Sequence, residues 1–203
     1  MSFRIENKYE LSITKLSELY IFLQDNSAKE IYPKRLIKSI YFDNQDFSSY
    51  QESVEGIVPK KKIRIRNYPE SSVNFNLEIK INSIEGRFKT TKNNIDYKKI
   101  LKNGYHDCDY GLCYPIVEVS YFRNYFSIFN LRVTLDTSIT YRKYKKKKII
   151  PYQETAIMEV KSDNLDNLNY IEKKIHFPKT RFSKYCNAIE QLDILNWKLV
   201  STQ

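Results

Sequence analysis

The sequence predicts one α+β domain over residues 1–203, built around an antiparallel sheet with one apolar face and one charged face. Three observations predict it. Five segments alternate apolar and charged residues with a period of two, which is the pattern of a strand. The strands expected between residues 60 and 93 are separated by short polar connections, which favours an antiparallel meander. Apolar residues recur at helical spacing near both ends of the chain. The pattern amounts to about eight strands and four helices.

Basic residues occur on the charged side of all five alternating segments. These segments are residues 4–9, 62–66, 77–81, 87–89 and 158–161. Because successive side chains of a strand point to opposite faces, the pattern predicts a sheet whose charged face is mostly cationic. If such a sheet closes on itself, the charges line a tunnel, and a cationic tunnel needs a polyanion to fill it.

The first half of the chain supplies most of the expected strands. Residues 2–11 predict a strand, and Thr14 is predicted to be the N-cap of the helix that follows. The apolar face of that helix consists of Leu16, Leu19, Tyr20 and Leu23. Further strands are predicted at residues 36–43, 60–68, 74–82 and 86–93, with a polar connection at 46–56 that has room for a helical turn. Gly104 is predicted to end a short helix at residues 95–103.

The second half adds more strands and then two helices. Strands are predicted within residues 116–129 and at 131–136, 138–142 and 156–161, after a loop that holds Cys108 and Cys113. Asp163 or Asn164 is expected to cap the first helix, and Ser183 the second. The apolar stripe of the first helix is Leu168, Ile171 and Ile175. The stripe of the second is Tyr185, Ala188, Ile189, Leu192 and Leu195.

Composition and charge restrict the class of ligand. The net charge is +10 and the pI is about 9.3, which favours nucleic acid, polyphosphate, nucleotides or an anionic membrane surface as a partner. The chain holds 4 glycines and no glycine-rich phosphate motif, so a phosphate site must use side chains. The lysines at 145–148 are interpreted first as a solvated loop and second as an electrostatic funnel.

The 3 cysteines leave at least one thiol unpaired, and we interpret all of them as reduced thiols in a cytoplasmic protein. The spacing of Cys108 and Cys113 lacks a matching second pair, which argues against a zinc site, and His106 is interpreted as a loop neighbour. The N-terminus opens into a strand pattern rather than a signal peptide. No apolar run approaches the length that spans a bilayer.

The charged face carries side chains suited to phosphate. Arg64 and Arg66 lie two residues apart on one strand, so they point to the same face about 7 Å apart. Arginine holds phosphate through paired, charge-assisted hydrogen bonds. Lys62 shares that face.

Two further places have an open interpretation. Glu159 shares a face with Lys161, and the strand pattern alone favours a salt bridge over a divalent metal site. Ser183 and Lys184 begin the last helix, where free N–H groups and the helix dipole favour an anion.

Taken in order, short motifs along nearly the whole chain resemble one family. They are Arg4-x-Glu6-x-Lys8-Tyr9, Ser39-Ile40-Tyr41-Phe42-Asp43-Asn44, Lys62-Ile63-Arg64-Ile65-Arg66-Asn67-Tyr68, Leu77-Glu78-Ile79-Lys80, Gly86-Arg87-Phe88-Lys89, Val119-Ser120-Tyr121-Phe122-Arg123, Arg132-Val133-Thr134-Leu135-Asp136, Met158-Glu159-Val160-Lys161 and Phe182-Ser183-Lys184-Tyr185. The ordered set resembles the VTC domain, the polyphosphate-polymerase branch of the triphosphate tunnel metalloenzymes.

The resemblance implies an eight-stranded antiparallel tunnel flanked by helices, in which ATP extends inorganic polyphosphate. It implies phosphate binding by Lys8, Arg64, Arg66, Lys80, Lys89, Tyr121, Arg123, Ser183 and Lys184. Lys62 and Lys161 share the charged face of their strands and are predicted to bind phosphate as well. Of these, Arg64, Arg66, Arg123 and Lys184 are the expected catalytic residues. Glu159 matches the carboxylate that holds Mn²⁺ or Mg²⁺. The hydrolase and cyclase relatives begin this motif with Glu, and Arg4 here favours the polymerase branch.

The sequence therefore predicts a cytoplasmic polyphosphate polymerase whose partners are ATP and polyphosphate. It predicts no nucleic-acid partner and no transmembrane segment, and it leaves room for a separate membrane partner. One alternative is a metal-dependent triphosphatase acting on inorganic triphosphate or nucleoside triphosphates. The other alternative is a non-catalytic polyphosphate-binding module.

Overall fold

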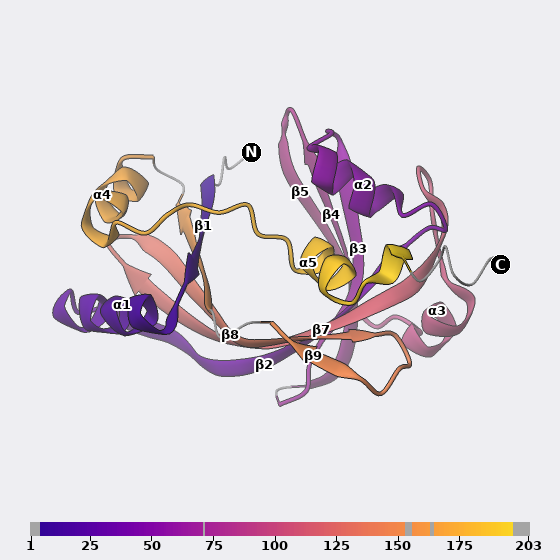
Figure 1. Ribbon diagram of the computed structural model, residues 1–203, viewed down its shortest axis with the longest axis horizontal. Helices are drawn as coiled ribbons and strands as arrows, with labels where there is room; N and C mark the ends of the chain where they lie inside the picture. The colour runs from indigo at the N-terminus through magenta and orange to yellow at the C-terminus, as the bar shows by residue number, and fades with distance from the viewer. Residues whose placement is uncertain (1–4, 71, 153–155, 163–164, 197–203) are drawn as a thin grey trace. The chain divides into compact units, whose positions relative to one another are not determined.

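A computed structural model describes residues 5–70, 72–152, 156–162 and 165–196 (Figure 1). Its strands are β1 (Ile5–Leu11), β2 (Lys29–Asp43), β3 (Lys60–Tyr68), β4 (Ser72–Ser83), β5 (Gly86–Lys92), β6 (Tyr105–Asp107), β7 (Gly111–Ile128), β8 (Leu131–Lys143), β9 (Ile149–Pro151) and β10 (Ala156–Ser162). Its helices are α1 (Ile13–Asp25), α2 (Ser48–Glu55), α3 (Tyr97–Asn103), α4 (Leu165–Ile175) and α5 (Lys184–Gln191).

The strands follow the order β1-β10-β8-β7-β2-β3-β4-β5, with β6 beside β7 and β9 beside β8. The pairings of β1 with β10, β10 with β8, and β2 with β3 are antiparallel. The predicted meander is present, because β3, β4 and β5 pair in sequence as antiparallel neighbours. This eight-strand order, together with the helices, confirms the predicted α+β fold class.

The strands differ most from the prediction in three places. β2 begins at Lys29 rather than at residue 36, and β7 begins at Gly111, within the segment predicted as a loop. The strands predicted at 131–136 and 138–142 form one strand, β8. Ser138, in the middle of β8, has a φ of 51°, in the left-handed region.

The helix caps are partly as predicted. Gly104 follows the last residue of α3, and the Ser183 side chain accepts a hydrogen bond from the Cys186 amide at the start of α5. The predicted N-cap Thr14 is wrong, because Thr14 lies inside α1 and Ser12 accepts from the Lys15 amide. The predicted caps at residues 163 and 164 lie outside the described residues.

Two members of the predicted apolar stripes are wrong. Tyr20 on α1 is 43% exposed, while Leu19 and Leu23 are buried as expected. Leu195 lies beyond the end of α5 at Gln191 and is 38% exposed. No helix in the described part of the chain is long and apolar enough to cross a membrane.

The chain divides into two compact units, which are described separately. Unit 1 is residues 1–36, 121–139 and 152–182, and unit 2 is residues 37–120, 140–151 and 183–203. In unit 1, Leu19 of α1 and Leu168 of α4 are buried in one core with Val133 of β8 and Val160 of β10. Each such side chain contributes about 1.5–3 kcal/mol on burial, so helices and strands hold one another in place.

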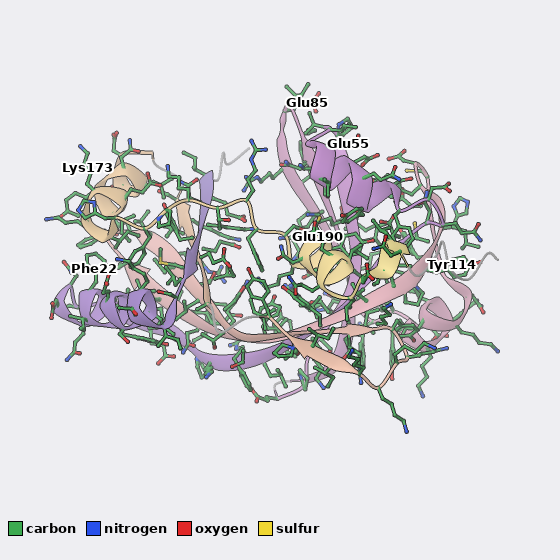
Figure 2. All side chains as sticks on the ribbon, viewed as in Figure 1. Phe22, Glu55, Glu85, Tyr114, Lys173 and Glu190 are labelled. Atoms are coloured by element: carbon green, nitrogen blue, oxygen red, sulfur yellow. The ribbon has the colours of Figure 1, made fainter. Side chains whose placement is uncertain are left out.

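The core of unit 2 shows the predicted division of the sheet into two faces. Ile63, Ile65 and Leu77 are buried in one apolar cluster, against which Ile100 and Leu101 of α3 pack. The residues between the two isoleucines and on either side of Leu77 point to the other face, because strand side chains alternate. That opposite face carries the charged side chains. Figure 2 shows the side chains on the ribbon, with Glu85 at the tip of the β4–β5 hairpin.

Candidate functional site

Unit 2 holds a group of charged side chains that we call the arginine cluster: Tyr41, Arg64, Arg66, Glu78 and Lys89. Strand register builds it, since Arg64 of β3 stands opposite Tyr41 of β2 and Glu78 of β4. The Nε and Nη2 groups of Arg64 donate to Glu78 Oε2 at 2.8 and 2.6 Å. Its Nη1 group donates to the Tyr41 hydroxyl at 3.1 Å.

The same carboxylate serves two further cations. Lys89 Nζ lies 2.6 Å from Glu78 Oε1, and Arg66 Nη1 lies 3.6 Å from Oε2. Arg66 also donates from Nε to the Ser39 hydroxyl at 3.1 Å. Burial alone raises the pKa of Glu78, but Arg64, Arg66 and Lys89 outweigh it and hold that pKa far below its usual range. Within the cluster, three cations therefore share one ionised carboxylate.

Burial makes this surplus of positive charge effective. Arg64 is 8% exposed and Arg66 is 6% exposed, so solvent and salt screen their charges weakly. Buried charges of one sign are costly to hold without a counter-ion. An anion with several oxygens, such as a chain of phosphates, matches the forked donors of two arginines.

Further basic residues predicted for phosphate lie in the same unit. Lys62, Lys80 and Lys89 are register partners in one row across β3, β4 and β5. Lys62 Nζ donates to the Ser183 hydroxyl at 2.8 Å, so β3 contacts the residue that caps α5. Lys184 is the first residue of that helix. Unit 2 thus brings together seven of the predicted residues: Lys62, Arg64, Arg66, Lys80, Lys89, Ser183 and Lys184.

Unit 1 holds a second group, which we call the carboxylate cluster: Glu6, Lys8, Arg123, Asp136, Glu159 and Lys161. The β1–β10 register places Lys8 opposite Glu159 and Glu6 opposite Lys161. Lys161 Nζ lies 2.7 Å from Glu159 Oε1 and 3.5 Å from Glu6 Oε2. Lys8 Nζ lies 3.4 Å from Glu6 Oε1 and donates to the Phe182 carbonyl at 3.0 Å.

Arg123 is held by a carboxylate that was not among the predicted site residues. Its Nη2 donates to Asp136 Oδ2 at 2.7 Å, and its Nε donates to Oδ1. Burial alone lowers the pKa of Arg123, but Asp136 outweighs it and raises that pKa. The Tyr121 ring centroid lies 5.3 Å from the guanidinium carbon of Arg123. Two predicted phosphate contacts, Tyr121 and Arg123, therefore lie side by side.

Glu159 suits the predicted divalent ion. Burial alone raises the pKa of Glu159, but Arg123, Lys161 and Lys8 hold it well below its usual range, so the side chain is a carboxylate. Glu6 and Glu159 are both ion-paired with Lys161. Mg²⁺ is usually bound by one or two carboxylates together with phosphate oxygens, and Mn²⁺ prefers the same oxygen donors. The donor set of unit 1 therefore fits such an ion alongside the salt bridge favoured by the strand pattern.

Unit 2 holds another group of potential metal ligands, which already pairs with a lysine. Asp107, Cys108 and Asp109 bring three possible ligand atoms together, which the sequence pattern did not predict. Lys61 Nζ already lies 2.7 Å from Asp107 Oδ1 and 2.6 Å from Asp109 Oδ2. The ammonium group takes the position that a cation would occupy. Cys108, Cys113 and Cys186 are free thiols.

The strand pattern could have found more of both clusters than it did. Glu78 and Asp136 lie in segments whose alternation was recognised, and that alternation puts them on the charged face. Tyr41 carried no signal, because an aromatic residue in a strand is usually core. The lysines at 145–148 are exposed between β8 and β9, in keeping with the solvated-loop interpretation.

The geometry can be compared with known proteins. The model of the VTC domain family matches residues 3–193. No curated protein matches the chain. A putative adenylate cyclase from Bacillus halodurans has a similar structure, with a TM-score of 0.63 at 16% identity, covering 94% of this chain and 98% of that one.

Two further solved structures share the fold. A putative adenylate cyclase from Vibrio parahaemolyticus has a TM-score of 0.55 at 13% identity, covering 90% of this chain and 95% of its own. A putative adenylyl cyclase from Hippeastrum, described as having a dominant triphosphatase activity, has a TM-score of 0.54 at 15% identity. It covers 93% of this chain and 96% of its own. At these identities the likenesses show the fold and not the reaction.

Proposed function

The chain belongs to the VTC domain family, and from this premise we propose that it is a metal-assisted polyphosphate polymerase that transfers the γ-phosphate of ATP to polyphosphate. The observation that carries the proposal is the arginine cluster, where Arg64, Arg66 and Lys89 share one carboxylate, Glu78. A reaction between two polyanions requires such concentrated positive charge. We propose a cytoplasmic location, where ATP is available and free thiols stay reduced.

The reaction needs charge stabilisation more than acid–base chemistry. An anionic terminal oxygen of the polyphosphate chain attacks the γ-phosphorus of ATP, the bond from that phosphorus to the β–γ bridging oxygen breaks, and ADP leaves. The attacking oxygen is already ionised, so no general base is required. Arg64, Arg66 and Lys184 spread the charge that develops on the transferred group, and Lys62, Lys80 and Lys89 bind neighbouring phosphates.

The carboxylate cluster has a different role in the proposal. Glu159, with Glu6 beside the same lysine, would hold a divalent ion, Mn²⁺ or Mg²⁺, and the bound ion would neutralise charge on phosphate oxygens. Arg123 and Tyr121 bind phosphate, and Lys8 and Lys161 add positive charge. The low pKa of Glu159 supports this role, because only the ionised side chain binds a cation well.

The test combines the protein with ATP and Mn²⁺, with and without a short polyphosphate primer, and measures ADP, orthophosphate and polymer together. We expect ADP and polymer in equal phosphate equivalents. ADP with free orthophosphate and no polymer would replace the polymerase with a hydrolase. An enzyme that forms neither product would contradict both.

A metal-dependent triphosphatase is the second candidate, because the Hippeastrum structure with this fold is described by that activity. Hydrolysis requires water to be activated, and in the described clusters the low pKa of Glu78 and of Glu159 makes each a weak base. That chemistry favours transfer to phosphate over transfer to water. The orthophosphate yield in the same assay decides between the two.

A further inference from the structure

Tyr41 connects the arginines to the last helix of unit 2. Its hydroxyl accepts a hydrogen bond from Arg64 Nη1 at 3.1 Å, and the residue is 4% exposed. Its ring stacks on that of Tyr185, with the centroids 5.4 Å apart and the planes 20° apart. Tyr185 directly follows the N-cap Ser183 and the first residue of α5, Lys184, both predicted to contact phosphate. The stacked pair therefore joins the arginine cluster to the start of α5, the two parts of the predicted phosphate site that lie in unit 2.

Tyr185 is itself fixed from the other side. Its hydroxyl donates to Asp43 Oδ2 at 2.6 Å. The Asp43 carboxylate also accepts from the backbone amides of Ser49 and Tyr50, at 3.1 and 3.0 Å, at the start of α2. Asp43 is fully buried, so these bonds are shielded from water. The start of α5 is thereby attached to β2, two residues away from Tyr41 on the same face of that strand.

The two phenols lie in opposite electrostatic surroundings. Burial alone raises the pKa of Tyr41, but Arg64, Arg66 and Lys184 outweigh it and lower that pKa below its ordinary value. Burial and the Asp43 carboxylate both raise the pKa of Tyr185 well above its ordinary value. The cations around Tyr41 thus favour negative charge on its oxygen, which accepts from Arg64, and the Tyr185 hydroxyl remains protonated and donates to Asp43.

We propose that Tyr41 and Tyr185 are positioning residues that hold the Arg64 guanidinium and the Ser183–Lys184 start of α5 in one arrangement ready for phosphate. The proposal rests on the phosphate-binding part of the proposed function and not on the transfer step. Arg64 is held by Glu78 on one side and by Tyr41 on the other, so its fork is fixed before the ligand arrives. Fixing a side chain beforehand removes much of the ordering cost of binding.

The experiment measures the affinity of the full chain for tripolyphosphate by calorimetry, without divalent ion, so that no turnover occurs. Tyr41→Phe removes the hydroxyl and keeps the stacked ring, and we expect about tenfold weaker binding. Tyr185→Phe should weaken binding by a similar factor, since it releases the start of α5. The matched control is Tyr110→Phe, which loses a phenol hydrogen bond to Glu52 in the same unit. It should change the melting temperature and leave the affinity unchanged.

Each outcome decides the matter. Unchanged affinity in Tyr41→Phe, with the unmodified protein binding, overturns the positioning role while the proposed function stands. Equal weakening in Tyr110→Phe also overturns it, because a general loss of stability would then explain the effect. If Tyr41→Phe fails to fold, the Tyr185→Phe affinity decides in the same way. Failure of the unmodified protein to bind tripolyphosphate contradicts the proposed function itself, and the positioning role with it.

Discussion

The two charged clusters differ in how their cations are neutralised. In the arginine cluster of unit 2, Arg64, Arg66 and Lys89 share the single carboxylate of Glu78. In the carboxylate cluster of unit 1, three cations stand against three carboxylates: Lys8, Arg123 and Lys161 against Glu6, Asp136 and Glu159. The arginine cluster therefore has more cations than carboxylates, which suits phosphate, and the carboxylate cluster has acidic groups that suit a divalent ion. The same strand alternation produces both, and register with the neighbouring strand decides which results.

The largest expected effect on activity comes from changing the arginine cluster. Arg64→Ala or Arg66→Ala should lower kcat for polymer synthesis by about a thousandfold, because each removes a forked donor from the developing charge. The fold should survive, since Glu78 keeps at least two of its three cations. The measurement is polymer formed from ATP with primer, with thermal unfolding of each variant. Arg35→Ala is the control, since Arg35 packs on the Tyr32 ring instead. Near-normal synthesis in both variants would contradict the proposal that the arginine cluster binds the reacting phosphates.

The next largest effect tests the carboxylate cluster. Glu159→Gln keeps the size of the side chain and removes the charge, so Mn²⁺ stimulation and activity should fall together by about a hundredfold. The measurement is a Mn²⁺ titration of activity for the variant and for the unmodified protein. Glu118→Gln is the control, since Glu118 pairs with Arg142 elsewhere. A variant that keeps the same Mn²⁺ response would show that Glu159 only pairs with Lys161.

Ion pairs in the carboxylate cluster should contribute more to the free energy of unfolding than a more exposed pair elsewhere. Asp136→Asn removes the charge of a buried carboxylate that pairs with Arg123, which is itself mostly shielded from solvent, and breaking a buried pair costs about 3–5 kcal/mol. Urea unfolding monitored by circular dichroism measures the loss. The comparison variant is Glu118→Gln, whose partner Arg142 is more exposed and whose cost should be about 1 kcal/mol or less. Equal costs in the two variants would show that the Asp136–Arg123 pair stabilises the fold no more than the Glu118–Arg142 pair does.

The charged face could be predicted from the sequence, but the ion pairs and hydrogen bonds that join its residues could not. Period-two alternation is enforced by strand geometry, so Arg64 and Arg66 could be placed on one face without a structure. The sharing of Glu78 depends on register between β3, β4 and β5, which the residues of one strand do not specify. The Tyr185 bond to Asp43 joins residues 142 positions apart, and no local pattern encodes it.

Helix starts and strand continuity show the same limit. Ser12 and Thr14 are equally good capping residue types, and only the backbone path decides that Ser12 meets the Lys15 amide. β8 was predicted as two strands, and no local pattern shows that pairing with β10 and then with β9 continues on both sides of Ser138, which has a left-handed φ. What the chain determines locally was therefore predictable, and what strand pairing determines was not.

A smaller effect should appear with pH. The pKa of Glu78 is lower in the folded protein than in the unfolded chain, because Arg64, Arg66 and Lys89 favour its ionised form. Its stabilising contribution is therefore complete above the unfolded pKa of about 4.3 and is lost as pH falls toward the folded pKa. We expect Glu78 to account for about 2 kcal/mol of the loss between neutral and acid pH. Urea unfolding at a series of pH values measures it, and Glu78→Gln should flatten that part of the curve. An unchanged acid slope in the variant would contradict the sharing of this carboxylate.

The smallest effect is expected outside both clusters. Lys145, Lys146, Lys147 and Lys148 are exposed between β8 and β9, so changing all four to Gln should alter the free energy of unfolding by less than about 0.5 kcal/mol. Calorimetry should give the same tripolyphosphate affinity as the unmodified protein, because exposed charges are screened within about 8 Å at physiological salt. A variant that binds more weakly than the unmodified protein at low salt, and equally well at high salt, would instead support the funnel interpretation. The contrast would then be between charges that hold phosphate and charges that guide it, and the buried arginines would remain the first kind.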